Sequence, residues 1–215
     1  MVVVAIDGPS GVGKTTVSRA VADALGVPHL DTGSYYRVAT LATLRASGDP
    51  AAEADVLDAL DDRSIDFVDG RLHLDGSDAS GLLRTNEVTA AVSAVASHAG
   101  VRRLLVEHQR SWVAERGGSA VVEGRDIGTV VFPDTPIKVF LTADPAVRAR
   151  RRAADEEASG RDVAEIETAL MARDTADSTR EVAPLQPAAD AVVIDTSELS
   201  VADVVRRILD LVGAV

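Results

Sequence analysis

The chain has 215 residues and a net charge of −12, and this length suits one domain with small inserts. The acidic charge argues against a nucleic-acid-binding surface, because non-specific affinity for phosphates needs a basic face. The chain has no cysteine for a disulfide framework and no apolar run near the roughly 18 residues of a membrane span. The first apolar run reaches Asp7 too soon for a signal peptide, so we expect a cytoplasmic protein with no membrane or nucleic-acid partner.

Short apolar segments alternate with helical stretches along the chain. The first apolar segment is a continuous β-branched run, which is typical of a strand buried on both faces. Strands are expected at residues 2–6, 27–30, 120–122, 137–141 and 191–194, and helices at 15–25, 33–46, 86–116, 145–174 and 200–212. This alternation predicts an α/β fold with a parallel sheet core and helices on both faces.

Two segments interrupt the alternation. Residues 65–68 and 71–74 flank an Asp-Gly pair, and a second Asp-Gly pair at 75–76 allows a third strand reaching about Leu83. Asp-Gly between short apolar runs is a strong hairpin signal, so we predict a small antiparallel insert. Residues 153–162 are polar and predict a mobile loop.

A phosphate-loop motif lies between the first predicted strand and the first predicted helix. Gly8-Pro-Ser-Gly-Val-Gly-Lys14-Thr15 matches the pattern G-x-x-x-x-G-K-[ST] in full. Its glycines let backbone N–H groups surround a phosphate, while Lys14 is expected to reach the β- and γ-phosphates and Thr15 to face Mg²⁺. The motif predicts a core of the P-loop NTPase type. The chain has no Asn-Lys-x-Asp motif, which argues against a GTPase, but a kinase, a motor-like ATPase and a non-catalytic nucleotide switch stay open.

The predicted helix after residue 144 carries three arginines on one face. Arg148, Arg151 and Arg152 fall at i, i+3 and i+4. Like charges on one face favour an anionic partner. A solvated surface with ion pairs to acidic residues 155–157 explains the pattern equally well.

A second charged face follows the polar loop. Arg173, Asp177 and Arg180 fall at i, i+4 and i+7, and an ordinary salt-bridged helix is the alternative explanation. Because the two arginine sets flank the polar loop, together they predict a lid that closes over transferring phosphates.

Charged residues also follow two predicted strands, where open parallel sheets bind ligands. Glu123-Gly-Arg125-Asp126 follows one strand, and Asp31-Thr32-Gly-Ser-Tyr-Tyr-Arg37 follows another. We interpret both segments as parts of a site. The alternative is helix capping, by Asp126 in the first segment and by Asp31 or Thr32 in the second.

The histidines and the single tryptophan lack a functional pattern. His29, His73, His98 and His108 have no common spacing, so we interpret them as structural or surface residues. Trp112 lies at helical spacing and is assigned to the core.

Four motifs resemble those of the bacterial cytidylate kinases, a family of nucleoside monophosphate kinases. They lie at residues 6–14, 31–37, 124–134 and 182–185. Their order and spacing match over essentially the whole chain, and the insert lies where these enzymes carry an extra small sheet. The Gly-Arg-Asp motif at 124–126 discriminates best, because adenylate and guanylate kinases lack it.

The resemblance implies transfer of the γ-phosphoryl group of ATP to CMP or dCMP with Mg²⁺, by a monomer. It divides a single kinase domain into a core of about 1–30, 84–145 and 175–215, a monophosphate-binding region of about 31–83 and a lid of about 148–173. The implied catalytic residues are Lys14, Arg125, Arg148 and Arg173.

The same resemblance implies the nucleotide contacts. Its ATP-binding residues are Gly8, Pro9, Ser10, Gly11, Val12, Gly13, Lys14, Thr15 and Thr16. Its acceptor-binding residues are Thr32, Tyr36, Arg37, Ser93, Arg102, Arg125, Asp126, Asp177 and Arg180. Of these, Ser93, Arg102 and Asp126 are the implied contacts to the base. Arg37 and Arg125 are the implied contacts to the phosphate, and Asp177 and Arg180 lie near the sugar by the same resemblance. Thr15 and, through water, Glu123 are the implied metal contacts.

Three positions depart from the family pattern. Thr32 stands where serine is frequent, Thr15 where glycine is frequent, and Glu123 where aspartate is common. The hydroxyl survives at Thr32, a direct metal contact of Thr15 stays open, and Glu123 has one more methylene of reach. An adenylate or shikimate kinase is the alternative enzyme.

Overall fold

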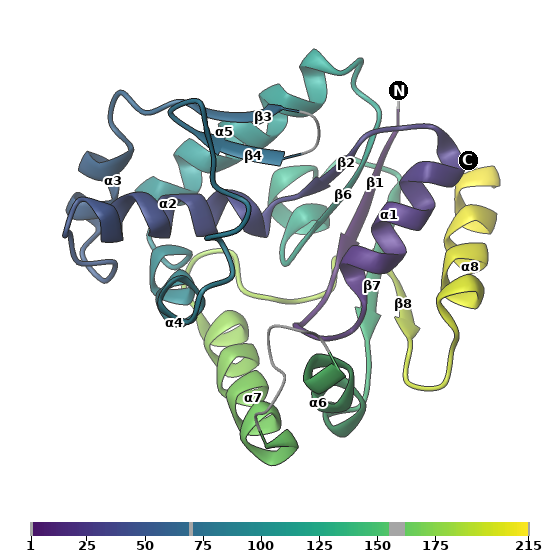
Figure 1. Cartoon of the computed structure of the whole chain (residues 1–215). Helices are drawn as coiled ribbons and strands as arrows, with labels where there is room; N and C mark the ends of the chain where they lie inside the picture. The colour runs from purple at the N-terminus through teal and green to yellow at the C-terminus, as the bar shows by residue number, and fades with distance from the viewer. Residues whose placement is uncertain (1, 69–70, 155–161, 215) are drawn as a thin grey trace. The chain divides into compact units, whose positions relative to one another are not determined.

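The computed structural model describes residues 2–68, 71–154 and 162–214. The chain folds into two compact units: the first consists of Met1–Asp31 and Arg110–Val215, and the second of Thr32–Gln109. Figure 1 traces the elements of each unit along the chain.

A five-stranded, entirely parallel sheet forms the first unit, in the order β2-β6-β1-β7-β8. Its strands are β1 (Val3–Asp7), β2 (His29–Asp31), β6 (Ala120–Gly124), β7 (Ile137–Thr142) and β8 (Val192–Asp195). All five residues of β6 are buried, as expected of a central strand with both faces covered. The predicted α/β fold with a parallel sheet is therefore confirmed.

Helices cover both faces of this sheet. Helices α1 (Lys14–Leu25) and α8 (Val201–Gly213) pack on one face, where Val4, Val17 and Ile208 belong to one apolar core (Figure 1). A π-helical turn, η1 (Ile127–Val131), lies against β1 and β6. Helices α6 (Pro145–Ala154) and α7 (Val163–Thr179) pack on each other through a smaller apolar cluster.

The second unit combines helices with a three-stranded antiparallel sheet. Its helices are α2 (Gly33–Arg45), α3 (Glu53–Leu60), α4 (Asn86–Val95) and α5 (Ala99–Glu115), which continues past the unit boundary. Its strands are β3 (Ile65–Val68), β4 (Arg71–Leu74) and β5 (Ser77–Asp78), which confirms the predicted insert. The first predicted turn, at residues 69–70, lies outside the described residues. At the second turn, Asp75 and Gly76 both have positive φ, as a tight hairpin requires.

Several helix boundaries differ from the predictions. The single helix expected over 86–116 is two helices, because the chain turns after Val95 and the Ser97 hydroxyl donates to the carbonyl of Ala94. Helix α3 was not predicted, although Val56, Ala59 and Leu60 have the apolar spacing of a helix. The stretch expected over 145–174 holds two helices, and α7 begins after Asp162, whose side chain accepts from the N–H of Ala164. The predicted mobile loop at 153–162 falls mostly on residues 155–161, outside the described residues.

Candidate active site

The phosphate loop connects the buried end of β1 to the first residue of α1. Gly8, Gly11 and Gly13 all have positive φ, which side-chain-bearing residues rarely adopt. At Gly8 an added Cβ would also lie 2.2 Å from the carbonyl oxygen of Leu141. The loop can therefore form only with glycine there, and it leads into the N-terminus of α1, where backbone N–H groups favour anions.

Lys14 is buried at the centre of this loop. Its ammonium group donates to the carbonyls of Gly8 and Pro9, at 2.8 and 2.6 Å. Burial and the positive charges of Arg125 and Arg173 lower the pKa of Lys14 to about 7, although Glu123 and Asp31 favour its charged form. An anion beside Lys14 would offset both effects, so this is an environment suited to phosphate.

Thr15, Glu123 and His29 form a hydrogen-bonded chain next to the loop. The Thr15 hydroxyl donates to Oε2 of Glu123 at 3.1 Å, and Nε2 of His29 lies 2.9 Å from Oε1 of the same carboxylate. His29, predicted to be a structural or surface residue, thus contacts Glu123, a predicted site residue. A hydroxyl and a carboxylate are hard oxygen ligands, and one or two of them suffice for Mg²⁺ bound together with phosphates. The residues present thus fit the implied metal.

Asp7 was missed by the sequence analysis. Its buried carboxylate accepts the backbone N–H groups of Ile127 and Gly128, both at 2.8 Å. Burial raises the pKa of Asp7 to about 6, against the lowering effect of these two hydrogen bonds. Asp7 therefore fixes the backbone that directly follows the Gly-Arg-Asp motif.

The Gly-Arg-Asp motif places Arg125 against α7. Nε of Arg125 donates to Oδ2 of Asp177 at 2.9 Å, which brings together two predicted acceptor-binding residues. Arg180 also lies near Asp177, with 3.9 Å between Nη1 and Oδ1. The prediction of a helical i+7 position for Arg180 is wrong, because α7 ends at Thr179 and Arg180 has extended backbone angles.

Asp126 is buried immediately before η1. Its side chain makes no capping hydrogen bond to that turn, so the capping alternative is not supported. Its negative charge contributes to the raised pKa of Asp7. Thr32 likewise precedes α2 without a side-chain capping bond.

Two arginines of α6, Arg148 and Arg151, contact different parts of the first unit. Arg148 forms an ion pair with Asp174 of α7 and donates to the Ser10 carbonyl of the phosphate loop at 3.2 Å. Arg151 instead donates to the carbonyl and hydroxyl of Thr196, at 2.6 and 3.0 Å. The alternative partners at 155–157 lie outside the described residues.

The remaining predicted acceptor-binding residues lie in the second unit. The Arg102 guanidinium lies over the Tyr36 ring, 5.3 Å from its centre, and donates to the carbonyl of Ala96. Arg37 donates to the carbonyl of Leu83 at 2.9 Å and to the hydroxyl of Thr89 at 3.1 Å. Ser93 lies on α4 one turn after Thr89, on the same helix face.

Two of the other histidines contact backbone carbonyls within the second unit, and Trp112 lies in the core. His73 and His98 lie at 3.3 and 3.0 Å from the backbone carbonyls of Gly76 and Pro50. Trp112 is buried, as predicted, with the guanidinium of Arg116 4.3 Å from its ring centre.

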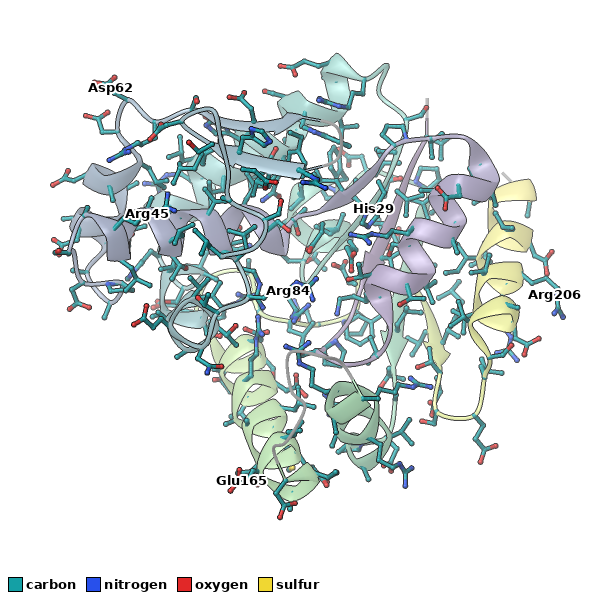
Figure 2. All side chains as sticks on the ribbon, in the orientation of Figure 1. His29, Arg45, Asp62, Arg84, Glu165 and Arg206 are labelled. Carbon is teal, nitrogen blue, oxygen red and sulfur yellow. The ribbon has the colours of Figure 1, made fainter. Side chains whose placement is uncertain are left out.

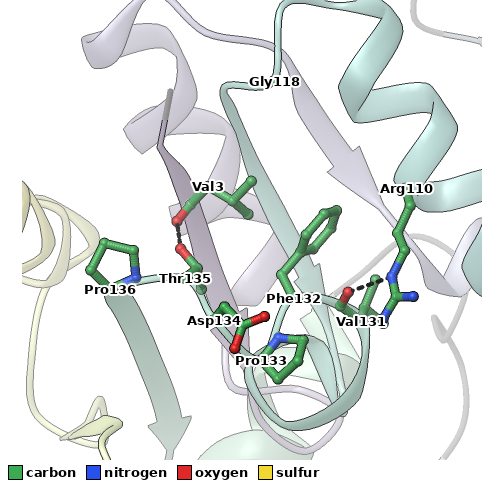
Figure 3. Close-up of a pocket in the computed structure, with 9 residues that line it drawn as sticks. All are labelled: Val3, Arg110, Gly118, Val131, Phe132, Pro133, Asp134, Thr135 and Pro136. Atoms are coloured by element: carbon green, nitrogen blue, oxygen red, sulfur yellow. Dashed lines mark hydrogen bonds between the residues drawn. The ribbon is translucent and has the colours of Figure 1, made fainter.

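A pocket lies at the end of the parallel sheet that is opposite the phosphate loop. It is bordered by residues at the amino-terminal ends of the strands, including Val3, Gly118 and Pro136 (Figure 3). Arg110 closes one side by donating to the carbonyls of Val130 and Val131. Residues 131–134 of the predicted 124–134 motif line this pocket, so they lie at the opposite end of the sheet from the phosphate loop.

The described part of the chain has neither a membrane-spanning helix nor a cluster of metal-binding side chains. None of its helices combines the length and apolar character needed to cross a membrane. Over the same residues, no cluster of three or more histidine, cysteine, aspartate and glutamate side chains is arranged to hold a metal.

A phosphate loop between the first strand and the first helix of a five-stranded parallel sheet is a fold of the P-loop NTPase type, as predicted. The fold is similar to that of shikimate kinase from Bacteroides thetaiotaomicron, with a TM-score of 0.52 and 17% identity over 99% of this chain and 98% of that one. At that identity the likeness shows the fold alone.

Sequence comparison identifies the family within this class. The cytidylate kinase family model matches residues 4–214. A cytidylate kinase of Mycolicibacterium paratuberculosis is 53% identical, and one of Mycobacterium leprae is 50% identical, each over 98% of this chain and 95% of the relative. The chain belongs to the cytidylate kinase family. It is a phosphotransferase that phosphorylates CMP with ATP, which decides against an adenylate or shikimate kinase and against a non-catalytic switch.

Proposed function

We propose that the chain transfers the γ-phosphoryl group of Mg²⁺-bound ATP in line to the phosphate of CMP or dCMP, using the residues around its phosphate loop. The observation that carries this proposal is the set of cationic side chains at that loop. Lys14 is buried near enough to Arg125 and Arg173 for both to lower its pKa. Such a concentration of positive charge suits the transfer of a phosphoryl group between two anionic phosphates.

Each cationic side chain has a distinct part in this proposal. Lys14 binds the donor phosphates, while Arg37 and Arg125 bind the acceptor phosphate. Arg148 and Arg173 stabilise the charge that spreads over the transferring group. No general base is required, because the attacking oxygen of the acceptor phosphate is already ionised.

Thr15 and Glu123 would hold Mg²⁺, Glu123 through water. The ion would neutralise charge on the β- and γ-phosphates as the bond to the leaving group breaks. The two side chains are suited to this because the Thr15 hydroxyl already lies 3.1 Å from the Glu123 carboxylate.

Two carboxylates of α7 hold arginines that the proposal assigns to phosphate. Asp174 pairs with Arg148, and Asp177 pairs with Arg125. Nucleotide phosphates carry more charge than a carboxylate and would compete for these guanidinium groups. We propose that this exchange accompanies movement of the lid, about residues 148–173, over the nucleotides and excludes water that would otherwise hydrolyse ATP.

The base of the acceptor is proposed to contact Ser93, Arg102 and Asp126, with Thr32 and Tyr36 beside it and with Asp177 and Arg180 near the sugar. Arg102 and Asp126 are both buried, with about 4% of each residue exposed to solvent. A buried polar group left without its partner is costly, so such residues discriminate strongly between bases.

The test compares two arginines of α6. We expect Arg148→Ala to lower turnover of CMP about a hundredfold through lost charge stabilisation. Arg150→Ala, an exposed neighbour on the same helix, is the matched control and should stay within about twofold of the unaltered protein. Removal of Mg²⁺ with EDTA should abolish turnover. Equal turnover in the two variants, or full turnover in EDTA, would contradict the proposal.

We further propose that the protein works as a cytoplasmic monomer without a nucleic-acid partner. The net charge of −12 supports the last point, because it disfavours binding to polyanions. Light scattering at micromolar concentration should give the mass of one chain, and a dimer mass would contradict this assignment.

A further inference from the structure

His29 holds the carboxylate that faces the phosphate loop. The carboxylate of Glu123 has a separate partner on each oxygen: Oε1 accepts from Nε2 of His29 at 2.9 Å, and Oε2 accepts from the Thr15 hydroxyl at 3.1 Å. Only about 3% of the Glu123 side chain and 15% of the His29 side chain are exposed. The contact is thus a largely desolvated one in which the ring N–H donates to a charged acceptor, a strong type of hydrogen bond.

Strand register explains why these three residues meet. In the parallel pair β2 and β6, His29 lies opposite Val121 and Asp31 lies opposite Glu123. Side chains two residues apart on a strand share a face, so His29, Asp31 and Glu123 all lie on the face covered by α1, which begins with Lys14 and Thr15. Figure 2 shows His29 in this position, beside α1.

The same register gives Glu123 an unfavourable neighbour. Asp31 lies directly opposite Glu123, and like charges in directly opposed positions repel. A glutamate has enough rotatable bonds to turn away from such a neighbour and from Thr15. The hydrogen bond from His29 opposes that rotation, because it fixes Oε1 and leaves Oε2 directed at Thr15.

We propose that His29 is a positioning residue that presents Oε2 of Glu123, together with the Thr15 hydroxyl, to the metal that accompanies ATP. His29 acts through Glu123, since its Nε2 is already hydrogen-bonded to that carboxylate and Mg²⁺ prefers oxygen ligands. The inference rests on the proposed magnesium site at Thr15 and Glu123. It goes beyond that site by assigning a role to a residue on a neighbouring strand.

The experiment measures ATP binding by calorimetry without any acceptor, once with Mg²⁺ and once in EDTA. For the unaltered protein the ratio of the two dissociation constants gives its preference for Mg²⁺-bound ATP. We expect His29→Leu to lower this preference about tenfold, as loss of a residue that orients a metal ligand typically does. Binding of metal-free ATP should not change, because the phosphate loop itself is untouched.

Two further variants separate positioning from folding and from the metal site. His29→Gln keeps an N–H donor and should restore the preference to within about threefold of the unaltered protein. Glu123→Gln should remove the preference, and His29→Leu added to it should then have no further effect, because the two residues act as one unit.

The outcomes distinguish the two claims. If Glu123→Gln removes the preference but His29→Leu retains it, the role of His29 is refuted and the magnesium site stands. If His29→Leu weakens binding equally with and without Mg²⁺, its role is structural and the inference fails. If Glu123→Gln leaves the preference intact, the proposed magnesium site fails, and the inference fails with it.

Discussion

The buried carboxylate of Asp7 predicts an unusual dependence of stability on pH. Burial raises its pKa from 3.8 to about 6. Between these two values the folded protein binds a proton at Asp7 more tightly than the unfolded chain does. The contribution of Asp7 to the free energy of unfolding therefore decreases as pH rises through this window and is smallest above pH 6.

The size of this effect follows from the pKa change. At 1.36 kcal/mol per pKa unit, the whole change amounts to about 3 kcal/mol, of which about 2 kcal/mol falls between pH 4.5 and 7. Asp7→Asn removes the titration, although its amide can accept only one of the two N–H groups that Asp7 accepts. We expect the lost hydrogen bond to lower the free energy of unfolding of Asp7→Asn by an amount that does not depend on pH. The titration of Asp7 in the unaltered protein adds a pH-dependent difference to this constant one.

The assay is urea unfolding of both proteins at pH 4.5, 5.5, 6.5 and 7.5, followed by circular dichroism. Other carboxylates titrate equally in both proteins, so the informative quantity is the unaltered protein's free energy of unfolding minus that of Asp7→Asn. We expect this difference to fall by about 2 kcal/mol between the lowest pH and neutrality. A difference that is constant over the range, or that rises with pH, would refute the reasoning.

Three shorter predictions concern the phosphate loop and Arg173, whose charge acts on Lys14. Lys14→Ala and Arg173→Ala should each lower turnover of CMP by about a hundredfold or more through lost charge stabilisation, and near-normal steady-state rates for both would contradict their assigned roles. Burial, Arg125 and Arg173 lower the pKa of Lys14 to about 7, so its amine is mostly neutral at pH 8 in the free protein. Because phosphates favour the charged form, ATP should bind with proton uptake at pH 8 and should bind more weakly toward pH 9. Calorimetry in buffers of different ionisation enthalpy tests this, and heats independent of buffer would count against it. Gly8→Ala, whose Cβ would lie 2.2 Å from the carbonyl oxygen of Leu141, should lose at least about 2 kcal/mol of stability in urea, whereas Gly213→Ala, which meets no atom within 4 Å, should stay within about 0.5 kcal/mol. Equal stability of the two glycine variants would refute the argument.

Local signals were enough to predict the sheet, the phosphate loop and the antiparallel insert. The β-branched run at 2–6, the glycines after it and the Asp-Gly turn at 75–76 each specify their structure within a few residues. Helix ends were harder to predict, because a single turn decides them. The chain leaves the helix after Val95 with no proline to mark the break, and Arg180 lies just beyond the end of α7.

The contacts that the sequence analysis missed join distant parts of the chain. Asp7 was overlooked because its partners, Ile127 and Gly128, lie about 120 residues away. His29 was set aside because its spacing to the other histidines carries no information, whereas the register of β2 against β6 places it beside Glu123. A carboxylate at the end of a fully apolar strand was the one available signal for Asp7, since buried charges are rare unless they have partners.

The measurement that tests the central claim most directly is ADP release with ATP and Mg²⁺, compared across CMP, dCMP, UMP, AMP and GMP as acceptors. We expect release to depend strongly on CMP or dCMP, with AMP and GMP far less efficient, and Asp126→Ala to narrow this difference. ADP released at the same slow rate with every acceptor, or most efficiently with a purine nucleotide, would contradict the account.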